Sequence, residues 1–327
     1  MGYISRDFLD DYTGYFVKCY ENYDKVCKRI HFFSNEFTQN DFEKLEINNK
    51  TNLKGLFKDY KGCMVVKRIP YSIIGYTLLD TYPDKGKTKK NLYGTKEYNI
   101  NLFGLNLPVK SLAYQEQDSV VSACATTAIW NVLSKAADNP RTLLKSPIEI
   151  TTSAGNIDAV NGRMFPNKNG LSIEQMINAL YEAKLVTEHK LGHNGNESNV
   201  EIKSEPFDND YLKQLIYAYA PIGIPQILIL KTYEKGLESG GSNKKKKNLK
   251  PTNGLHAVTI VGFKNSDNPN FLNNQLQVKK IDSKSIKKYF KSRYIERIYC
   301  HDDQFGPFVK CNLHWLVFSH QPNQESR

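Results

Sequence analysis

The sequence predicts an α+β fold, in which a group of helices precedes an antiparallel sheet. Two observations predict it. Apolar residues recur at helical spacing in the segments 123–136, 170–185 and 208–220. Nearly continuous apolar runs of strand length follow them, at 224–230 and 255–263. Because the helical and extended patterns occupy different parts of the chain, the helices are expected to lie apart from the sheet.

The first third of the sequence carries less regular patterns. Aromatic residues recur at intervals of three and four between residues 6 and 29, which predicts one helix over that range. The segment 61–70 predicts a strand, and residues 92–114 predict further strands and turns. A chain of 327 residues corresponds to about two domains. We expect an N-terminal α/β domain over residues 1–105, with a role in recognition, and a second domain over 106–327.

The helices of the second domain have clear sequence signals. The first is rich in alanine and carries Ile129, Val132 and Leu133 on one side. Ser172 and Gln175 form the signature of a capping box at the start of the next helix. Both helices are therefore expected to pack one apolar face against a core.

The composition is that of a soluble globular protein. Hydrophobic residues make up 40% of the chain and charged residues 24%, so the chain can bury a core. No apolar run approaches the ~18 residues that a membrane-spanning helix needs, and the N-terminus carries no secretory signal pattern. The six cysteines are scattered without a CxxC pair, which is typical of a reducing compartment. We therefore expect a cytoplasmic protein without a membrane span.

The net charge of +11 permits an acidic partner without identifying one. Its clearest cluster is formed by residues 244–247 and Lys250, and the flanking glycine, serine and asparagine are typical of a solvated loop. This loop lies just before His256, so it could border a cleft and attract acidic peptides. No nucleic-acid-binding signature accompanies the lysines, and a nucleic-acid partner is not expected.

One cysteine differs from the others by its position. Cys124 stands at the start of the first predicted helix, where free backbone N–H groups and the positive end of the helix dipole favour a thiolate. A thiolate is a nucleophile, and a neighbouring imidazolium favours it further. Taken alone, a buried core cysteine is the more common case.

Two later segments supply the partners that such a nucleophile needs. His256 begins an apolar strand directly after a glycine-containing loop, a position suited to facing a cleft. Asp302 and Asp303 lie where another strand gives way to a turn. Either carboxylate could accept a hydrogen bond from the second ring nitrogen of His256 and fix its tautomer.

A glutamine completes the set. Gln117 lies seven residues before Cys124, in the loop that enters the helix. A side-chain amide there could join the Cys124 backbone N–H in an oxyanion hole. Gln115 competes with Gln117 for this role.

The joint order of these residues resembles that of the papain-like cysteine peptidases (clan CA), and it is most similar to their C39-like branch. The matching stretches are QEQDSVVSACATTAIWNVL, HAVTIVGF and DDQFG. The likeness covers roughly residues 110–320. Ala125 and Thr126 stand where the branch usually has Gly-Pro or Gly-Ser after the cysteine.

The resemblance implies a papain-like catalytic domain over 106–327, with a helical subdomain and an antiparallel sheet. It implies that Cys124 is the nucleophile, that His256 is the general base and acid, that Asp302 orients His256, and that Gln117 serves the oxyanion hole. The implied activity is that of a cysteine peptidase or isopeptidase, which hydrolyses a peptide or amide bond through a covalent acyl-enzyme.

Two alternatives remain open. The same fold could carry acyl or amide transfer, which differs only in the acceptor. It could also serve as an inactive papain-like protein-binding module, because residues 1–105 match no part of a peptidase and could contact a protein partner. The expected partner is otherwise a peptide or protein substrate.

No cofactor or metal is expected. Cys300, His301, Cys311 and His314 suggest zinc, but their spacing fits no common structural zinc site. Adjacent residues in a strand also point to opposite faces, which separates Cys300 from His301.

Overall fold

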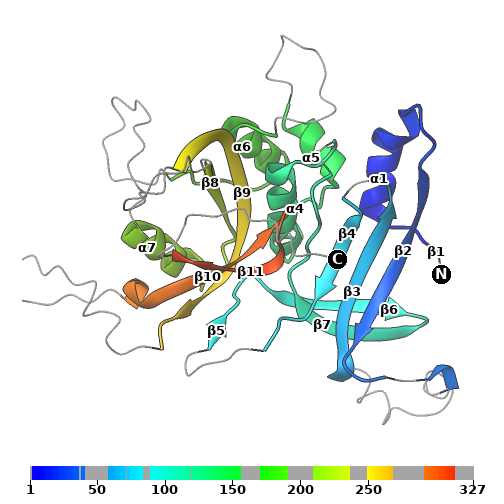
Figure 1. Cartoon of the computed structure of the whole chain (residues 1–327), viewed down its shortest axis with the longest axis horizontal. Coiled ribbons are helices and arrows are strands. Elements are labelled where there is room, and N and C mark those ends of the chain that lie inside the picture. The colour runs from blue at the N-terminus through cyan, green and yellow to red at the C-terminus, as the bar shows by residue number, and fades with distance from the viewer. Residues whose placement is uncertain are drawn as a thin grey trace, which may run out of the picture.

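The chain forms an α+β molecule with antiparallel sheets, as the sequence predicts (Figure 1). The structure is a computed structural model. It describes residues 2–36, 38–40, 58–70, 72–83, 89–118, 120–155, 170–190, 209–235, 249–267 and 291–313. Figure 1 shows one sheet on each side of the molecule, with most of the helices above and between them.

The N-terminal sheet has four strands in sequential order, each antiparallel to the next. They are β1 (Gly2–Tyr3), β2 (Asp24–Phe33), β3 (Tyr60–Arg68) and β4 (Ile74–Leu79). β3 confirms the strand predicted in 61–70. Helix α1 (Arg6–Gly14) covers one end of this sheet, where Phe8 packs with Phe16, Cys27 and Val65.

The predicted helix over residues 6–29 is wrong beyond Gly14. α1 ends there, a short 3-10 turn η1 (Phe16–Lys18) follows, and β2 begins at Asp24. A Cβ on Gly14 would lie 2.0 Å from the Ile148 side chain, so the last residue of the helix has room only for glycine. The aromatic spacing that suggested a longer helix instead builds one cluster, made by side chains from α1, η1 and the segment that follows.

A hairpin joins the N-terminal sheet to the rest of the chain. Its strands are β6 (Lys96–Leu102) and β7 (Leu105–Ser111), which confirms the strands predicted in 92–114. Beyond β7, the backbone of Tyr114 exchanges two hydrogen bonds with Thr77 of β4, at 2.8 and 3.0 Å. The chain then enters the loop that leads to Cys124, so the N-terminal sheet fixes the beginning of that loop.

The helices that the structure describes after β7 are α4 (Cys124–Ala136), α5 (Pro147–Ser153), α6 (Ile173–Glu182) and α7 (Asn209–Tyr219). Every residue of α4 from Ala125 to Ser134 is buried, which makes it the central helix. The capping box at the start of α6 is confirmed. Ser172 Oγ accepts from the Gln175 N–H at 3.2 Å, and Gln175 Oε1 accepts from the Ser172 N–H at 2.8 Å.

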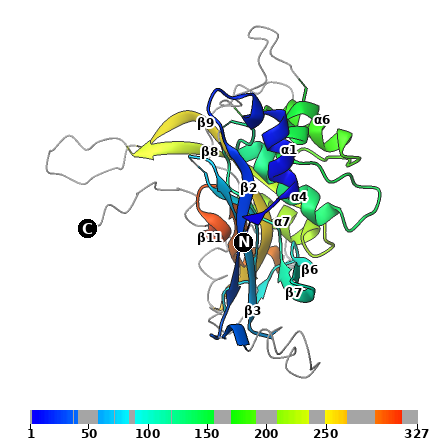
Figure 2. The same cartoon turned by 90° about the vertical axis from the view of Figure 1, so that its right-hand side faces the viewer.

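The second sheet carries the candidate site. Its strands are β5 (Lys90–Asn91), β8 (Gln226–Lys235), β9 (Leu249–Asn265), β10 (Ile295–Asp302) and β11 (Gly306–Asn312). They pair in the order β11-β10-β9-β5, and β8 also pairs with β9. α4 packs against β9, where Thr259 Oγ1 donates to the Ala128 carbonyl at 3.0 Å. Figure 2 shows β8 and β9 running together away from the rest of the molecule.

The hydrophobic core crosses residue 105, the boundary expected between the two domains. One cluster of buried side chains unites Tyr60, Leu78 and Ile100 with Ile129 and Leu133 of α4. The division into two domains remains a prediction, but the two parts share this core and are packed together.

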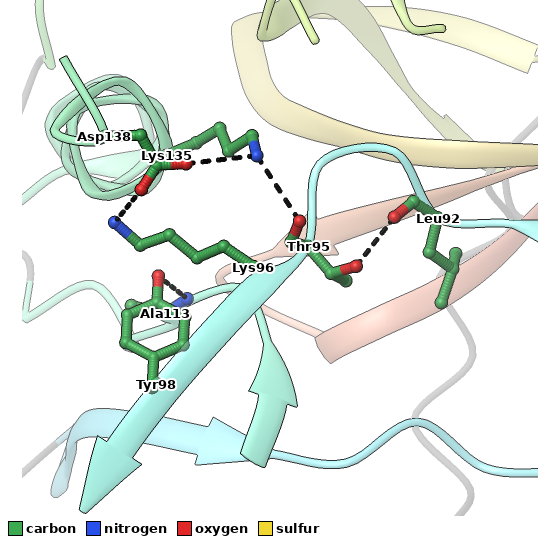
Figure 3. Close-up of polar contacts among 7 residues, drawn as sticks. All are labelled: Leu92, Thr95, Lys96, Tyr98, Ala113, Lys135 and Asp138. Atoms are coloured by element: carbon green, nitrogen blue, oxygen red, sulfur yellow. Dashed lines mark hydrogen bonds and ion pairs between the residues drawn. The ribbon is translucent and has the colours of Figure 1, made fainter. Parts of the chain in front are cut away.

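A polar cluster fastens the hairpin to the far end of α4 (Figure 3). Asp138 pairs with Lys96 at 3.0 Å and with Lys135 at 3.3 Å. Lys135 also donates to the Thr95 carbonyl at 3.4 Å. The cysteine end and the opposite end of α4 are thus both tied to elements from the first part of the chain.

One expectation concerns a segment outside the described residues, the lysine cluster at 244–247. A short 3-10 turn, η2 (Lys291–Tyr294), precedes β10. Among the described residues, no helix combines the length and the apolar character that crossing a membrane requires.

Candidate active site

Cys124 is the first residue of α4, as its sequence position suggests. The preceding residue, Ala123, has extended backbone and caps the helix with no side-chain hydrogen bond, and the first turn contains no acidic residue. No capping side chain or acidic residue therefore neutralises the positive end of the helix, where the half-buried Cys124 thiol lies. The Cys124 Sγ lies 3.9 Å from the Leu255 carbonyl, next to His256 in the chain.

His256 lies in β9, where it interacts with the Cys124 thiol and lies close to two carboxylates. Its Nε2 lies 3.2 Å from Asp302 Oδ1 and 3.7 Å from Asp303 Oδ1. The shorter contact is an ion pair in which the N–H direction departs from a linear hydrogen bond. The His256 side chain is 9% exposed, so this cluster lies largely out of water.

The sheet register explains why the two aspartates meet His256. In the antiparallel pair of β9 and β10, His301 lies opposite Thr259, so the end of β10 runs past His256. Asp302 Oδ1 accepts hydrogen bonds from the backbone N–H groups of Gln304 at 2.9 Å and Phe305 at 3.3 Å. These two bonds hold the Asp302 carboxylate in place.

Asp303 differs from Asp302 in its hydrogen bonding. Both residues are buried, with 1% of Asp302 and 3% of Asp303 exposed. Neither carboxylate oxygen of Asp303 has a hydrogen-bond partner among the described residues. The nearer and better-fixed carboxylate, Asp302, is the stronger candidate for orienting His256.

The electrostatics of the cluster favour an imidazolium. Burial alone lowers the pKa of His256, but the contacts with Asp302 and Cys124 and the charge of Asp303 outweigh it, and the pKa rises to about 10. Burial raises the pKa of the Asp303 carboxyl to about 6, against the charge of His256, which lowers it. A histidine that stays protonated at neutral pH beside a cysteine is suited to stabilising a thiolate.

The loop before Cys124 is folded around one carboxylate. Asp118 Oδ1 accepts the backbone N–H groups of Val120, Val121 and Ser122 at 2.8 to 2.9 Å. The Asp118 N–H donates to the Ser122 carbonyl at 2.9 Å and closes the loop. We call Asp118 and residues 120–122 the Asp118 turn. It draws Gln117 back toward the start of α4.

The two glutamines differ in burial. Gln115 is buried, and its Nε2 has no hydrogen-bond partner among the described residues. Gln117 is half-buried and lies immediately before the Asp118 turn. No contact between either amide and Cys124 is recorded in the described part of the chain, so the choice between them stays open.

Asp118 is the residue that sequence reasoning missed. The signal was an aspartate at the start of a short polar loop, because aspartate side chains often accept backbone N–H groups two or more residues further on. Spacing from Cys124 alone favours Gln117 and gives no signal for the neighbouring Asp118.

His256, Asp302 and Asp303 could also hold a metal ion. Each offers a ligand atom, and the three atoms lie within 4.8 Å of one another. Two residues of the zinc set considered in the sequence have other surroundings. Cys300 packs in the core beneath the second sheet, whereas His301 contacts the rings of Tyr114 and Phe308.

No family model, curated protein or solved structure matches this chain.

Proposed function

We propose that the chain is a papain-like cysteine hydrolase, similar to the C39-like branch, that cleaves a peptide or amide bond through a covalent acyl-enzyme. The observation that carries the proposal is the position of His256. It contacts the thiol at the start of α4 and lies 3.2 Å from the Asp302 carboxylate. Three residues far apart in the sequence thus meet in the order that nucleophilic catalysis needs.

In the proposed reaction, the Cys124 thiolate attacks the carbonyl carbon of the scissile bond. The bond from sulfur to carbon forms, and the carbonyl oxygen takes up the negative charge. The imidazolium of His256 then gives its proton to the departing amine, and an acyl-enzyme remains. Neutral His256 next takes a proton from water, which attacks the thioester and regenerates the thiolate.

The negative oxygen of the intermediate needs hydrogen-bond donors. The uncapped start of α4 offers the Cys124 backbone N–H and the helix dipole. The Asp118 turn supports Gln117 as a second donor, because it folds the chain back toward the helix start. Gln115 is the alternative donor, since its buried amide has no partner among the described residues.

Cleavage of a mixed peptide library tests the proposal. The wild-type chain is expected to create new peptide N-termini, which mass spectrometry detects. Cys124→Ala and His256→Ala are expected to lose this activity by at least about a thousandfold while keeping the circular dichroism spectrum and melting temperature of a folded chain. Added amines separate hydrolysis from transfer, because a transferase forms amide products with them.

Two results would overturn the proposal. Cleavage that persists in Cys124→Ala would exclude Cys124 as the nucleophile. Activity that a chelator abolishes and zinc restores would instead assign His256, Asp302 and Asp303 to a metal centre.

A further inference from the structure

Two carboxylates converge on one ring nitrogen of His256. Asp302 Oδ1 lies 3.2 Å from Nε2, and Asp303 Oδ1 lies 3.7 Å from it. Neither contact is a hydrogen bond, because Nε2 has no hydrogen-bond partner among the described residues. The same holds for both carboxylate oxygens of Asp303. The cluster therefore brings a nitrogen and carboxylate oxygens together without satisfying either residue by hydrogen bonding.

These unsatisfied atoms are buried. The side chain of His256 is 9% exposed, and those of Asp302 and Asp303 are each 1% exposed. Buried polar atoms in folded proteins nearly always have a partner, because a missing one is costly. Since Nε2 and Asp303 Oδ1 lie so close together, a single cation between them can contact both.

The angles of these contacts suit a metal ion better than a hydrogen bond. A hydrogen bond needs its acceptor close to the N–H axis of the ring. Zn²⁺ binds an imidazole nitrogen at about 2.0–2.1 Å and a carboxylate oxygen at about 2.0–2.2 Å, in a tetrahedral arrangement. Nitrogen and oxygen on one ion are then about 3.3 Å apart, with the oxygen roughly 35° off the ring axis. Contacts of 3.2 and 3.7 Å that depart from the N–H direction fit this geometry.

The donor set is also that of a zinc site. His256, Asp302 and Asp303 each offer one ligand atom, and the three atoms lie within 4.8 Å of one another. One imidazole with two carboxylates suits Zn²⁺, and three protein ligands leave a fourth position for water. The backbone N–H groups of Gln304 and Phe305 hold the Asp302 carboxylate in place, as hydrogen bonds to ligands do in metal sites.

We propose that His256 Nε2 and the carboxylates of Asp302 and Asp303 bind Zn²⁺. The ion takes the place of the proton on Nε2, which is released to solvent when the ion binds. It satisfies the ring nitrogen and the oxygens of Asp303 together, which a proton on the ring axis does not.

The effect of the ion on activity rests on the proposed hydrolase function, whereas binding of the ion does not. With Zn²⁺ on Nε2, the ring of His256 keeps only the proton on Nδ1. Release of that proton leaves an imidazolate, so the ring is a poorer acid toward the departing amine than an imidazolium is. Zn²⁺ is therefore expected to inhibit the hydrolase, and a chelator to restore it.

The binding test uses the full chain with Cys124→Ala, so that the nucleophile cannot hold the ion. Zinc chloride is titrated in competition with a chromophoric chelator, and one ion should bind per chain. X-ray absorption at the zinc edge should show nitrogen and oxygen ligands at about 2.0–2.2 Å, without the sulfur ligand at about 2.3 Å that a cysteine site gives. Asp303→Asn and His256→Gln should each weaken binding at least about tenfold.

The matched controls are Asp80→Asn and His189→Gln, which change an exposed carboxylate and an exposed imidazole outside the cluster. Both should bind zinc as the Cys124→Ala chain does, and circular dichroism checks that every variant is folded. Absence of saturable binding would overturn the proposal. Sulfur ligands at the zinc edge, or equal losses in the controls and the cluster variants, would overturn it as well.

Cleavage of the peptide library then tests the effect on the wild-type chain. Zinc should inhibit cleavage, a chelator should reverse the inhibition, and Asp303→Asn should need at least about tenfold more zinc for half-inhibition. Equal inhibition of Asp303→Asn would place the inhibiting ion on the Cys124 thiol and overturn this effect.

The remaining outcomes separate the two proposals. If zinc binds the cluster but no peptide is cleaved with or without chelator, the hydrolase function fails and the metal site stands. If peptides are cleaved and no zinc binds, the metal site fails and the hydrolase function stands.

Discussion

His256 meets two adjacent carboxylates, and the contacts of each suggest different roles. Asp302 lies closer to Nε2 and is held by two backbone N–H groups. Asp303 lies further away and has no hydrogen-bond partner among the described residues. The better-fixed carboxylate is suited to orienting the imidazole, since a firmly held acceptor also fixes the tautomer.

The two asparagine variants test this assignment. Asp302→Asn should slow the alkylation of Cys124 by iodoacetamide at pH 6 by at least about tenfold, because the imidazolium loses its principal partner. Asp303→Asn should change that rate by less than about threefold. Rates are read for each cysteine by mass spectrometry of the digested protein. A larger loss in Asp303→Asn would exchange the two roles.

The raised pKa of His256 predicts how stability depends on pH. The pKa rises from 6.5 in the unfolded chain to about 10 in the folded chain. The folded state therefore binds the proton more tightly, and the resulting stabilisation is complete below pH 6.5 and is lost as the pH rises to about 10. The melting temperature of the wild type should exceed that of His256→Gln by the largest margin near pH 6.

This margin should shrink steadily toward pH 10 in thermal scans of both proteins in matched buffers. Packing differences between histidine and glutamine add an offset that does not vary with pH. A margin that stays constant or grows between pH 6 and 10 would show that His256 is not held as an imidazolium.

At the scale of elements, the Asp118 turn links the N-terminal sheet to the cysteine helix. It begins beyond the backbone pairing of Tyr114 with Thr77 and ends where α4 begins. Thr151 of α5 donates to the Val121 carbonyl at 2.8 Å and holds the turn from the other side. Because the turn is held on both sides, it fixes where the first residue of α4 lies.

Removing the carboxylate of Asp118 should be far more costly than removing a surface carboxylate. Asp118→Ala leaves backbone N–H groups in a buried turn without an acceptor, which should lower the free energy of unfolding by about 2–5 kcal/mol. It should also slow Cys124 alkylation, because the start of α4 loses its support. Chemical denaturation and alkylation rates measure the two effects.

Asp138→Ala is the matched control. Its side chain is 54% exposed and pairs with Lys96 and Lys135, so its loss should cost about 0–1 kcal/mol and leave Cys124 unaffected (Figure 3). Equal costs in the two variants would contradict the role of the Asp118 turn.

Elements with a regular apolar pattern could be predicted from the sequence, and those fixed by tertiary contacts could not. α4 and the capping box of α6 carry local signals, and both are found where the sequence indicates them. The helix predicted over 6–29 is wrong because its aromatic side chains pack with one another from different elements. Periodicity records which side chains are buried, but a cluster built from several segments can imitate a single helix.

The candidate site was predicted by residue type and order, but not in its detail. Sequence order identified Cys124, His256 and the aspartate pair. It could not decide between Asp302 and Asp303, because that depends on the register of β9 and β10 and on two backbone bonds in the following turn. Asp118 was missed because its role depends on backbone N–H groups of the turn that follows it, which residue type alone does not reveal.

At the scale of the whole molecule, the first part of the chain packs against the elements that carry the site. β5 pairs with β9, the strand of His256, and the core around α4 contains Tyr60, Leu78 and Ile100.

A chain of residues 106–327 alone should therefore lack a complete core and unfold without a cooperative transition. The full-length Cys124→Ala protein is the control for solubility and cooperativity in the same calorimeter. A cooperative transition in residues 106–327, together with a reactive Cys124, would show instead that 1–105 is a separable domain.

The most direct test of the central claim is the rate at which iodoacetamide alkylates each cysteine between pH 4 and 9, in the wild type and in His256→Ala. An ordinary thiol is below ~1% thiolate at pH 6. If Cys124 pairs with a protonated His256, it should react at pH 6 roughly tenfold faster than an ordinary exposed thiol, because the gain in thiolate outweighs the lower nucleophilicity of a thiolate of low pKa, and His256→Ala should remove this advantage. A Cys124 that reacts no faster than an ordinary thiol, or equally fast without His256, would contradict the claim that these two residues form a catalytic pair.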